Sequence, residues 1–508
     1  MAFMATASTF DALPVSPRFR GLARLKRVIS FPAMLGALLV AGLFVFLGKF
    51  DIDPDVWWHL KVGQDILATH RWPTADVYSF TAHGAPWIAY EWLGEVLLAS
   101  VQRAFGLRGL MVLDLALGSA IVLALYALAW LRSGDCRAAF LACMLLLSPI
   151  VFSCTMRPQM LGYLFLVLTL IILERFRQGH AGALWLLPPL FVAWVNTHGT
   201  FVIGLFALLV YLTGGWVEIH WSSLESTPWT ASQRIRLGLV FAASLAALIA
   251  TPYGTRLAAY PLDMALSQPI NVSNVQEWQP MPFGLLQGKI FLAVLVGFLL
   301  AQVVFRPTWQ LAEFTLFVVG VAAACLHARF FLVFVPFSAP LVAVILSRLI
   351  PARPPGKDIY VLNALLMTAS VVLIVAYFPS RKQIENYMAG RWPVEAVRYI
   401  ESHPPPRPMY NSYYYGGFLV SALDGRNKVF IDGRADAYER AGVLADYLRI
   451  ERATPIALPL LGVYHVQSCL LQRKEALATV LAASPQWHVA YADEVSALFV
   501  RRQTGEQW

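Results

Sequence analysis

The chain has 508 residues, 58% of them hydrophobic and only 14% charged, and its formal net charge is +9 at pH 7. Because soluble domains average about 25% charged residues, this composition excludes a soluble globular protein and indicates an α-helical chain that crosses a membrane many times. The basic residues stand singly between apolar segments, so the positive charge indicates membrane topology and no nucleic-acid partner. Five cysteines without paired spacing predict neither a disulfide framework nor a metal site.

The N-terminal segment, residues 1–30, carries five basic residues and is predicted to be a cytoplasmic tail. The apolar stretch that begins at Phe31 has about 20 residues, which is enough to span a bilayer. No small-residue cleavage site follows it, so we expect a retained signal anchor rather than a signal peptide.

Residues 31–380 are predicted to form a transmembrane domain of eleven helices. With the N-terminus inside, every predicted cytoplasmic connection contains at least one arginine, as the positive-inside rule requires. We therefore expect the C-terminal region to lie on the outer, non-cytoplasmic side of the membrane. The predicted spans begin near Phe31, Leu110, Ala138, Leu161, Leu184, Phe201, Leu237, Ile290, Leu311, Phe331 and Tyr360.

The first outer loop, residues 51–109, begins with the acidic stretch "DIDPDVWWHL". Asp53 precedes Pro54, which is typical of a helix start, and Asp55 and His59 follow on one face of the predicted helix. One interpretation is structural, because an aspartate that caps a helix is common and contributes only about 1 kcal/mol. The other interpretation is chemical and depends on which groups share this side of the membrane.

A second acidic helix start follows in residues 87–106, "WIAYEWLGEVLLASVQRAFG". Glu91 and Glu95 interrupt the apolar sequence, whereas the apolar residues recur at helical spacing on the other face. Such an amphipathic helix is predicted to lie in the membrane interface rather than to cross it. Asp53, Asp55 and Glu91 are therefore candidate catalytic residues, suited to general-base catalysis or to binding a divalent cation that holds a phosphate.

Residues 381–508 are predicted to form a small periplasmic α/β domain. In this region "PVEAVRYIESH" and "EALATVLAASP" predict helices, and "KVFIDGR", "VYHVQSCLLQR" and "WHVAYADEVSALFVRR" predict strands. The run "YNSYYYGGFL" indicates a β-turn packed on the membrane domain, with carbohydrate stacking as the alternative. Asp432, Arg434 and Asp436 follow a predicted strand, at a place where ligand contacts are often found.

The order of these features resembles the GT-C class of integral-membrane glycosyltransferases, which includes the protein O-mannosyltransferases and the aminoarabinose transferases of lipid A. The stretch "DPDVWWHLKVGQDILATHRWPTAD" is similar to the acidic start of the first loop helix in that class, with Asp53 and Asp55 in the place of its acidic pair. The stretch "APWIAYEWLGEVLLASVQRAFG" is similar to a second motif of the loop, with Glu91 in the place of its glutamate. One position departs from the pattern, because Gln159 follows Arg157 where the class often carries an acid.

The resemblance implies transfer of a sugar, with inversion, from a polyprenyl-phosphate-linked donor to a glycan, lipid or protein acceptor, with an outer-loop aspartate as the general base. It also implies cations near the lipid phosphate, since an unpaired phosphate at the membrane boundary is costly. Membrane lipids are expected partners, and a divalent cation is left open as a cofactor. For Arg157 and Arg329 the alternative is interface snorkelling, and for His198 it is a structural role. The candidate substrate-binding residues are His59, Arg157, Gln159, Asn196, His198 and Arg329.

Two other classes of function compete with this hypothesis. A transporter or flippase of a lipid-linked or cell-envelope substrate places ionisable residues in mid-membrane and often shows inverted repeats. The predicted spans contain few deep charges and no internal repeat is evident. A scaffold that recruits cell-wall partners through its C-terminal domain would not need Asp53, Asp55 or Glu91.

Overall fold

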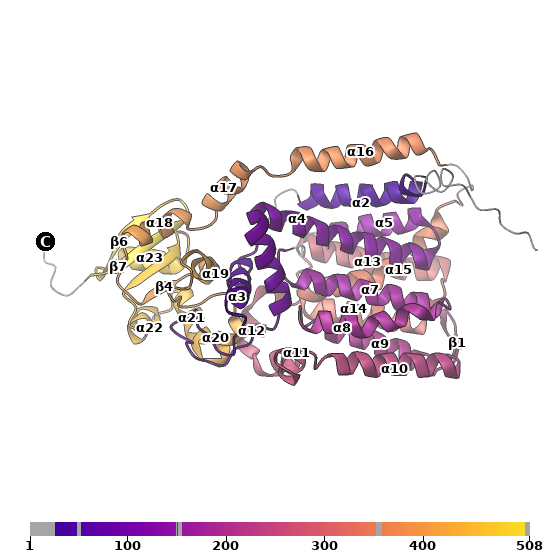
Figure 1. The fold of residues 1–508 in the computed structure, drawn as a ribbon, viewed down its shortest axis with the longest axis horizontal. Coiled ribbons are helices and arrows are strands. Elements are labelled where there is room, and N and C mark those ends of the chain that lie inside the picture. Colours follow the sequence, from indigo (N-terminus) through magenta and orange to yellow (C-terminus); the bar gives the residue numbers. More distant parts are fainter. Residues whose placement is uncertain (1–25, 48–51, 149, 151–154, 352–357, 503–508) are drawn as a thin grey trace, which may run out of the picture.

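The structure, a computed structural model of the chain, describes residues 26–47, 52–148, 150, 155–351 and 358–502. Long helices run side by side in one bundle, and a smaller α/β unit is attached at one end of it (Figure 1). Most of the predicted basic tail, residues 1–30, lies outside the described residues.

The bundle is made of apolar helices, which satisfy their backbone hydrogen bonds internally, as a lipid environment requires. Among the described residues, five segments are long and apolar enough to cross a membrane: α4 (Trp92–Ser133), α7 (Gln159–Arg177), α13 (Leu286–Phe305), Ala328–Leu349, which joins η3 (Ala328–Phe330) to α15 (Phe331–Leu349), and α16 (Tyr360–Tyr377). The shorter helices are α2 (Phe31–Leu47), α5 (Cys136–Leu145), η1 (Ala181–Leu186), α8 (Leu187–Val195), α9 (Phe201–Gly214), α10 (Ala231–Ala247) and α14 (Leu311–Leu326). Every predicted span begins inside or beside one of these helices. The helical membrane architecture is confirmed, and the number of eleven spans stays a prediction.

Helix α4 is interrupted at Gly106, whose φ of 65° lies in the left-handed region that favours glycine. The break separates residues 92–105 from the part of α4 that continues into the bundle. Residues 92–105 pack on α3 (Val56–Thr69) so closely that a Cβ atom at Gly63 would lie 2.1 Å from the Glu95 carbonyl oxygen. The two acid-bearing helices of the first outer loop are therefore in backbone contact.

The C-terminal unit contains a four-stranded sheet with the order β4–β5–β7–β6. Strand β4 (Met409–Asn411) is parallel to β5 (Ser468–Gln472), and β7 (Ser496–Arg501) is antiparallel to both β5 and β6 (Trp487–Ala492). Its helices are α17 (Arg381–Ala389), α18 (Val394–Ser402), α19 (Tyr413–Ala422), α20 (Ala435–Arg440), α21 (Val443–Glu451), α22 (Ala457–Val463) and α23 (Ala476–Ala483). The connections between bundle helices contain a small sheet of β1 (Ile219–Trp221), β2 (Leu224–Ser226) and β3 (Trp309–Gln310), and the helices α11 (Thr255–Ser267), α12 (Pro269–Asn274) and η2 (Gln276–Trp278).

The predicted strand "KVFIDGR" is not a strand of this sheet. Its only ladder contact within the described residues is an isolated bridge between Val429 and Ser79 of the first outer loop. The side chain of Asn411 accepts a hydrogen bond from the Phe430 amide (2.8 Å) and donates one to the Ile431 carbonyl (2.8 Å). The prediction of a strand was wrong because the Asn411 side chain forms the hydrogen bonds with the backbone of Phe430 and Ile431 that a neighbouring strand would otherwise form.

The run "YNSYYYGGFL" forms the end of β4 and helix α19, so the predicted β-turn was also wrong. The two glycines are needed at this place by packing. A Cβ atom at Gly417 would lie 2.9 Å from the Pro54 carbonyl oxygen at the start of α3, and one at Gly416 would lie 2.0 Å from the Ile431 carbonyl oxygen. Helix α19 thus joins the α/β unit to the first outer loop.

A buried arginine holds the same two parts together. Arg434 is 1% exposed, and its guanidinium contacts Asp76 of the outer loop (2.7 Å) and Asp432 of the C-terminal unit (2.6 Å). Its guanidinium carbon also lies 4.8 Å from the ring centre of Trp87 and 4.9 Å from that of Tyr78. Asp432 and Arg434, which the sequence placed near a ligand, therefore fix the position of the C-terminal unit.

Candidate active site

The junction between the bundle and the C-terminal unit encloses a cavity of about 570 Å³, a size typical of a small-molecule site. Figure 1 shows α3, α11, α12 and α20 close together at this end of the bundle. The cavity is lined by α3, the residues before α4 and α7, the N-terminal turn of α9, α11, η2, η3 and the start of α20. Segments that are far apart in the sequence therefore line the same cavity.

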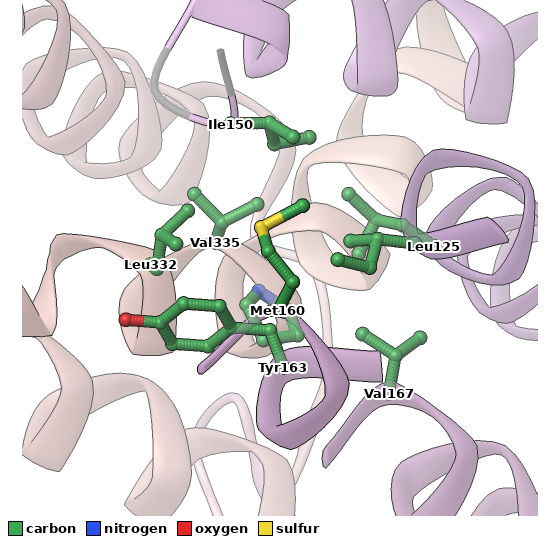
Figure 2. A pocket seen from close by; sticks show the side chains of 9 residues that line it. Leu125, Ile150, Met160, Tyr163, Val167, Leu332 and Val335 are labelled. Atoms are coloured by element: carbon green, nitrogen blue, oxygen red, sulfur yellow. The ribbon is translucent and has the colours of Figure 1, made fainter. Parts of the chain in front are cut away.

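A second cavity, inside the bundle, does not have the character of an active site. It measures about 20 Å³, and Figure 2 shows side chains of α4, α7 and α15 around it, including Leu125, Met160, Tyr163 and Val335. No charged side chain of the described residues lines it. Its size is that of about one water molecule, so this cavity is a small packing defect.

Three carboxylates of the larger cavity converge on one guanidinium. Arg157 contacts Asp53 (2.7 Å), Asp55 (3.0 Å) and Glu277 (3.1 Å). The other carboxylate oxygen of Asp53 accepts a hydrogen bond from the Asp55 amide (2.9 Å), and Asp55 directly precedes α3. Burial raises the pKa of Asp55 to about 7, although Arg157 lowers it and Asp53 raises it further. At neutral pH this group both binds and releases protons readily.

The Asp55 carboxylate occupies space that a side chain at residue 433 would fill. A Cβ atom at Gly433 would lie 1.9 Å from Asp55 Oδ1 and 2.7 Å from Trp58 Nε1. The Trp58 indole N–H is buried and has no hydrogen-bond partner within the described part of the chain. The glycine of "VFIDGR" is thus required by the site.

The second acidic group is Glu91, which lies between two histidines. Its carboxylate oxygens lie 3.5 Å from His59 Nε2 and 3.3 Å from His198 Nε2. The Thr200 amide donates to His198 Nδ1 (3.2 Å), so a neutral His198 ring carries its proton on Nε2, toward Glu91. His59 Nδ1 in turn lies 3.1 Å from Glu95 Oε1.

Burial decides the charge of this group. It raises the pKa of Glu91 to about 8, although Arg157 and Arg329 lower it. Burial, with Arg329 and Arg157 nearby, lowers the pKa of His198 to about 3, and burial likewise lowers the pKa of His59 well below its usual value. At neutral pH Glu91 is therefore mainly protonated and both imidazoles are neutral.

The cavity also offers a guanidinium that has no acidic partner. Arg329 lies 4.1 Å from the ring centre of Trp278, and among the described residues no carboxylate pairs with it. The Trp278 carbonyl is 2.6 Å from His327 Nδ1, which fixes the tryptophan beneath Arg329. Arg329 is therefore more available to an anion in the cavity than Arg157, which is shared among three acids.

The cavity also contains two buried polar atoms without hydrogen-bond partners among the described residues. Asp436 is 2% exposed and its Oδ2 makes no hydrogen bond, and the Tyr260 hydroxyl, in a residue that is 5% exposed, makes none either within the described chain. Tyr260 stacks on Tyr90, with 4.1 Å between ring centres. Burial raises the pKa of Asp436 to about 6, against the lowering effect of Arg440 and Arg434.

The structure brings most of the predicted site residues together. The cavity is lined by Asp55, His59, Glu91, Arg157, Gln159, His198 and Arg329, and Asp53 reaches it through Arg157. Asn196 does not line it: its side chain accepts from Trp92 Nε1 (2.7 Å) and donates to the carbonyls of Val192 and Ala250, which ties α8 to the start of α4.

Several residues of the site were not predicted. Glu95 had a signal in the sequence, because it lies four residues after Glu91 on the same predicted helix face. Tyr260 and Thr200 had none, since each belongs to a segment that only tertiary packing brings to the cavity. Within the described residues no three His, Cys, Asp or Glu side chains are grouped to hold a metal ion. The guanidinium of Arg157 lies at the point where Asp53, Asp55 and Glu277 converge.

No protein-family model and no curated protein sequence matches the chain. Among solved structures, ArnT from Cupriavidus metallidurans in the apo state matches with a TM-score of 0.51 and 14% identity, over 95% of this chain and 98% of that one. ArnT from the same organism bound to undecaprenyl phosphate matches with a TM-score of 0.51 and 14% identity, over 96% and 99% of the two chains. The oligosaccharyltransferase of Archaeoglobus fulgidus in the apo form matches with a TM-score of 0.48 and 13% identity, over 86% of this chain and 69% of that one.

Proposed function

We propose that this chain, which has the fold of the GT-C glycosyltransferases, moves a sugar from a polyprenyl-phosphate-linked donor to an acceptor hydroxyl at the periplasmic face of the bacterial inner membrane. The observation that carries the proposal is a single cavity that combines an unpaired guanidinium, a carboxylate whose pKa is near neutrality, and an apolar wall. The undecaprenyl phosphate bound by the Cupriavidus protein supports a donor of this type.

The cavity suits both parts of such a donor. Arg329 and Arg157 would bind the phosphate by charge-assisted hydrogen bonds, which are about twice as strong as neutral ones. Val202, Leu262 and Phe330 provide an apolar wall, and Leu262 is 63% exposed outside it. An isoprenoid chain would lie along this wall and continue into the bilayer.

Asp55 is the proposed general base. It would take the proton of the acceptor hydroxyl while the acceptor oxygen bonds to the anomeric carbon and the bond from that carbon to the phosphate oxygen breaks. The lipid phosphate leaves with the electron pair, and a single displacement inverts the anomeric centre. Glu91, protonated at neutral pH, adds no negative charge beside the phosphate and can donate a hydrogen bond to it.

The pH dependence of the reaction follows from these two acids. Asp55 has to be ionised, so kcat/KM is expected to rise with pH through about 7. Glu91 has to stay protonated, so kcat/KM is expected to fall as the pH exceeds about 8. The apparent pKa values of the rising (lower) and falling (upper) limbs of this pH profile describe the interacting acids together rather than single residues. Measurement from about pH 5 to about pH 10 tests this, and Glu91→Gln should remove the upper limb only. A profile that is flat on the acidic side would contradict Asp55 as the base.

Binding of the lipid phosphate gives an independent test. Arg329→Gln is expected to weaken the binding of undecaprenyl phosphate to the purified protein in lipid nanodiscs by about tenfold or more, because one charge-assisted contact is lost. Arg398→Gln is the matched control, since Arg398 is exposed on the C-terminal unit and pairs with Glu395. Equal affinity of wild type and Arg329→Gln would place the phosphate elsewhere.

The structure gives the transporter alternative no comparable support. Four charged side chains inside the bundle pair with one another at the end of α7 that is remote from the cavity: Arg177 contacts Glu174 (2.7 Å) and Glu313 (3.3 Å), and Arg132 contacts Glu313 (2.5 Å). Asp114 of α4 is a single buried acid outside this network. Such a network stabilises helix packing and leaves no open polar path among these residues.

A further inference from the structure

The proposed mechanism uses the acids and arginines of the cavity but leaves Asp436 and Tyr260 without a role. Both residues are buried and line the cavity, and each has a polar side-chain atom without a hydrogen-bond partner within the described residues. The Tyr260 hydroxyl is near enough to Asp436 to lower its pKa, yet the two groups make no hydrogen bond of normal geometry. A buried polar atom without a partner costs about 1–3 kcal/mol, so two neighbouring ones that face one cavity indicate a ligand that bridges them.

The chemistry of these atoms defines the ligand. The carboxylate of Asp436 accepts hydrogen bonds, and the Tyr260 hydroxyl can donate and accept. The stacked rings of Tyr90 and Tyr260 add a rigid aromatic edge beside them. An acceptor carboxylate next to a phenol and an aromatic edge suits the hydroxyl groups of a sugar ring, and it repels a phosphate.

The place of this pair within the cavity agrees with that chemistry. Arg157 and Arg329 lower the pKa of Glu91 and Asp436 raises it, so Glu91 lies within electrostatic reach of both groups. Arg440, Arg434 and the neighbouring Tyr260 hydroxyl lower the pKa of Asp436 itself. Glu91 is thus near both the arginines and Asp436, and all of these groups line the same cavity.

We propose that Asp436 and Tyr260 form a subsite that binds the hydroxyl groups of a sugar ring. This inference rests on the proposed function and deepens it. The ring belongs either to the donor, whose sugar is joined directly to the phosphate, or to a glycan acceptor. Both sources present the same hydroxyl chemistry to the subsite.

The test compares two lipid probes. Undecaprenyl phosphate and undecaprenyl-phosphate-linked mannose or glucose are titrated against wild type, Asp436→Asn and Tyr260→Phe in nanodiscs. For a donor ring, both variants are expected to bind the sugar-bearing lipids about tenfold more weakly and undecaprenyl phosphate within about twofold of wild type. Asp446→Asn, at an acid of the same unit that pairs with Arg449 on the surface, is the matched control.

A second arm identifies an acceptor ring. Transfer to methyl glycosides of common hexoses is measured at saturating donor, and an acceptor subsite predicts a kcat/KM about tenfold lower in both variants while both lipids bind as in wild type. Unchanged lipid binding together with unchanged transfer in Asp436→Asn and Tyr260→Phe would overturn the subsite. A wild-type protein that binds neither lipid would overturn the proposed function itself, so the two failures are distinct.

Discussion

Replacing Asp55 with asparagine is expected to slow sugar transfer by about 10²–10⁴-fold, which is the usual contribution of a general base. Asparagine keeps the size of the side chain beside Gly433 but cannot take a proton from the acceptor hydroxyl. It also removes one of the three acids that share Arg157, so binding of the lipid phosphate should not weaken. The loss is therefore expected in kcat rather than in donor affinity.

The comparison with Glu91→Gln makes this result specific. Glutamine imitates the protonated carboxyl that Glu91 carries at neutral pH, so this variant is expected to keep activity within about tenfold of wild type. Asp446→Asn controls for the loss of an acid that pairs with Arg449 and is not among the residues that line the cavity. The melting temperature of each variant shows whether it is folded. Full activity in Asp55→Asn, with activity abolished in Glu91→Gln, would transfer the role of base to Glu91.

Replacing Arg434 with methionine is expected to lower the free energy of unfolding by about 3–5 kcal/mol, because removal of one partner leaves buried charges without compensation. Asp76 and Asp432 are both completely buried and both contact this guanidinium. The cation–π contacts with Trp87 and Tyr78 would be lost as well. The α/β unit should then separate more easily from the first outer loop.

Thermal or denaturant unfolding in detergent measures this effect, and limited proteolysis between the bundle and residue 381 measures the separation. Arg398→Met is the control, since this exposed arginine pairs with Glu395 at the surface and its loss should change stability by no more than about 0.5 kcal/mol. If Arg434→Met and Arg398→Met had the same unfolding midpoint, the buried arginine would not hold the two parts together.

The helices of the bundle could be predicted because length and apolar composition alone decide whether a segment can lie in lipid. The predicted spans near Phe31, Phe201, Leu311 and Tyr360 begin where α2, α9, α14 and α16 begin. In the C-terminal unit, amphipathic spacing similarly predicted α18 and α23. Two segments there could not be predicted, since Asn411 replaces a strand partner for Phe430 and Ile431, and the glycines of α19 serve close packing rather than a turn.

The candidate site shows the same division. Asp55, Glu91 and His59 stand at or near helix starts on the predicted outer side, which a single sequence reveals through charge and spacing. That Arg157 meets Asp53, Asp55 and Glu277 depends on the packing of α7 and η2 against the outer loop, and no local pattern encodes such a contact. Arg434 and Asp436 are two residues apart in sequence. Only the fold shows that Arg434 pairs with Asp76 of the first outer loop, whereas Asp436 lines the cavity.

The most direct test of the account is sugar transfer by the purified wild-type protein in lipid. The protein is supplied with a panel of undecaprenyl-phosphate-linked sugars, and release of undecaprenyl phosphate is followed over time beside Asp55→Asn. The account predicts release from at least one donor by wild type and a rate at least about 100-fold lower for Asp55→Asn. Release at equal rates by both proteins, or no release from any donor by a folded wild type that binds undecaprenyl phosphate, would contradict it.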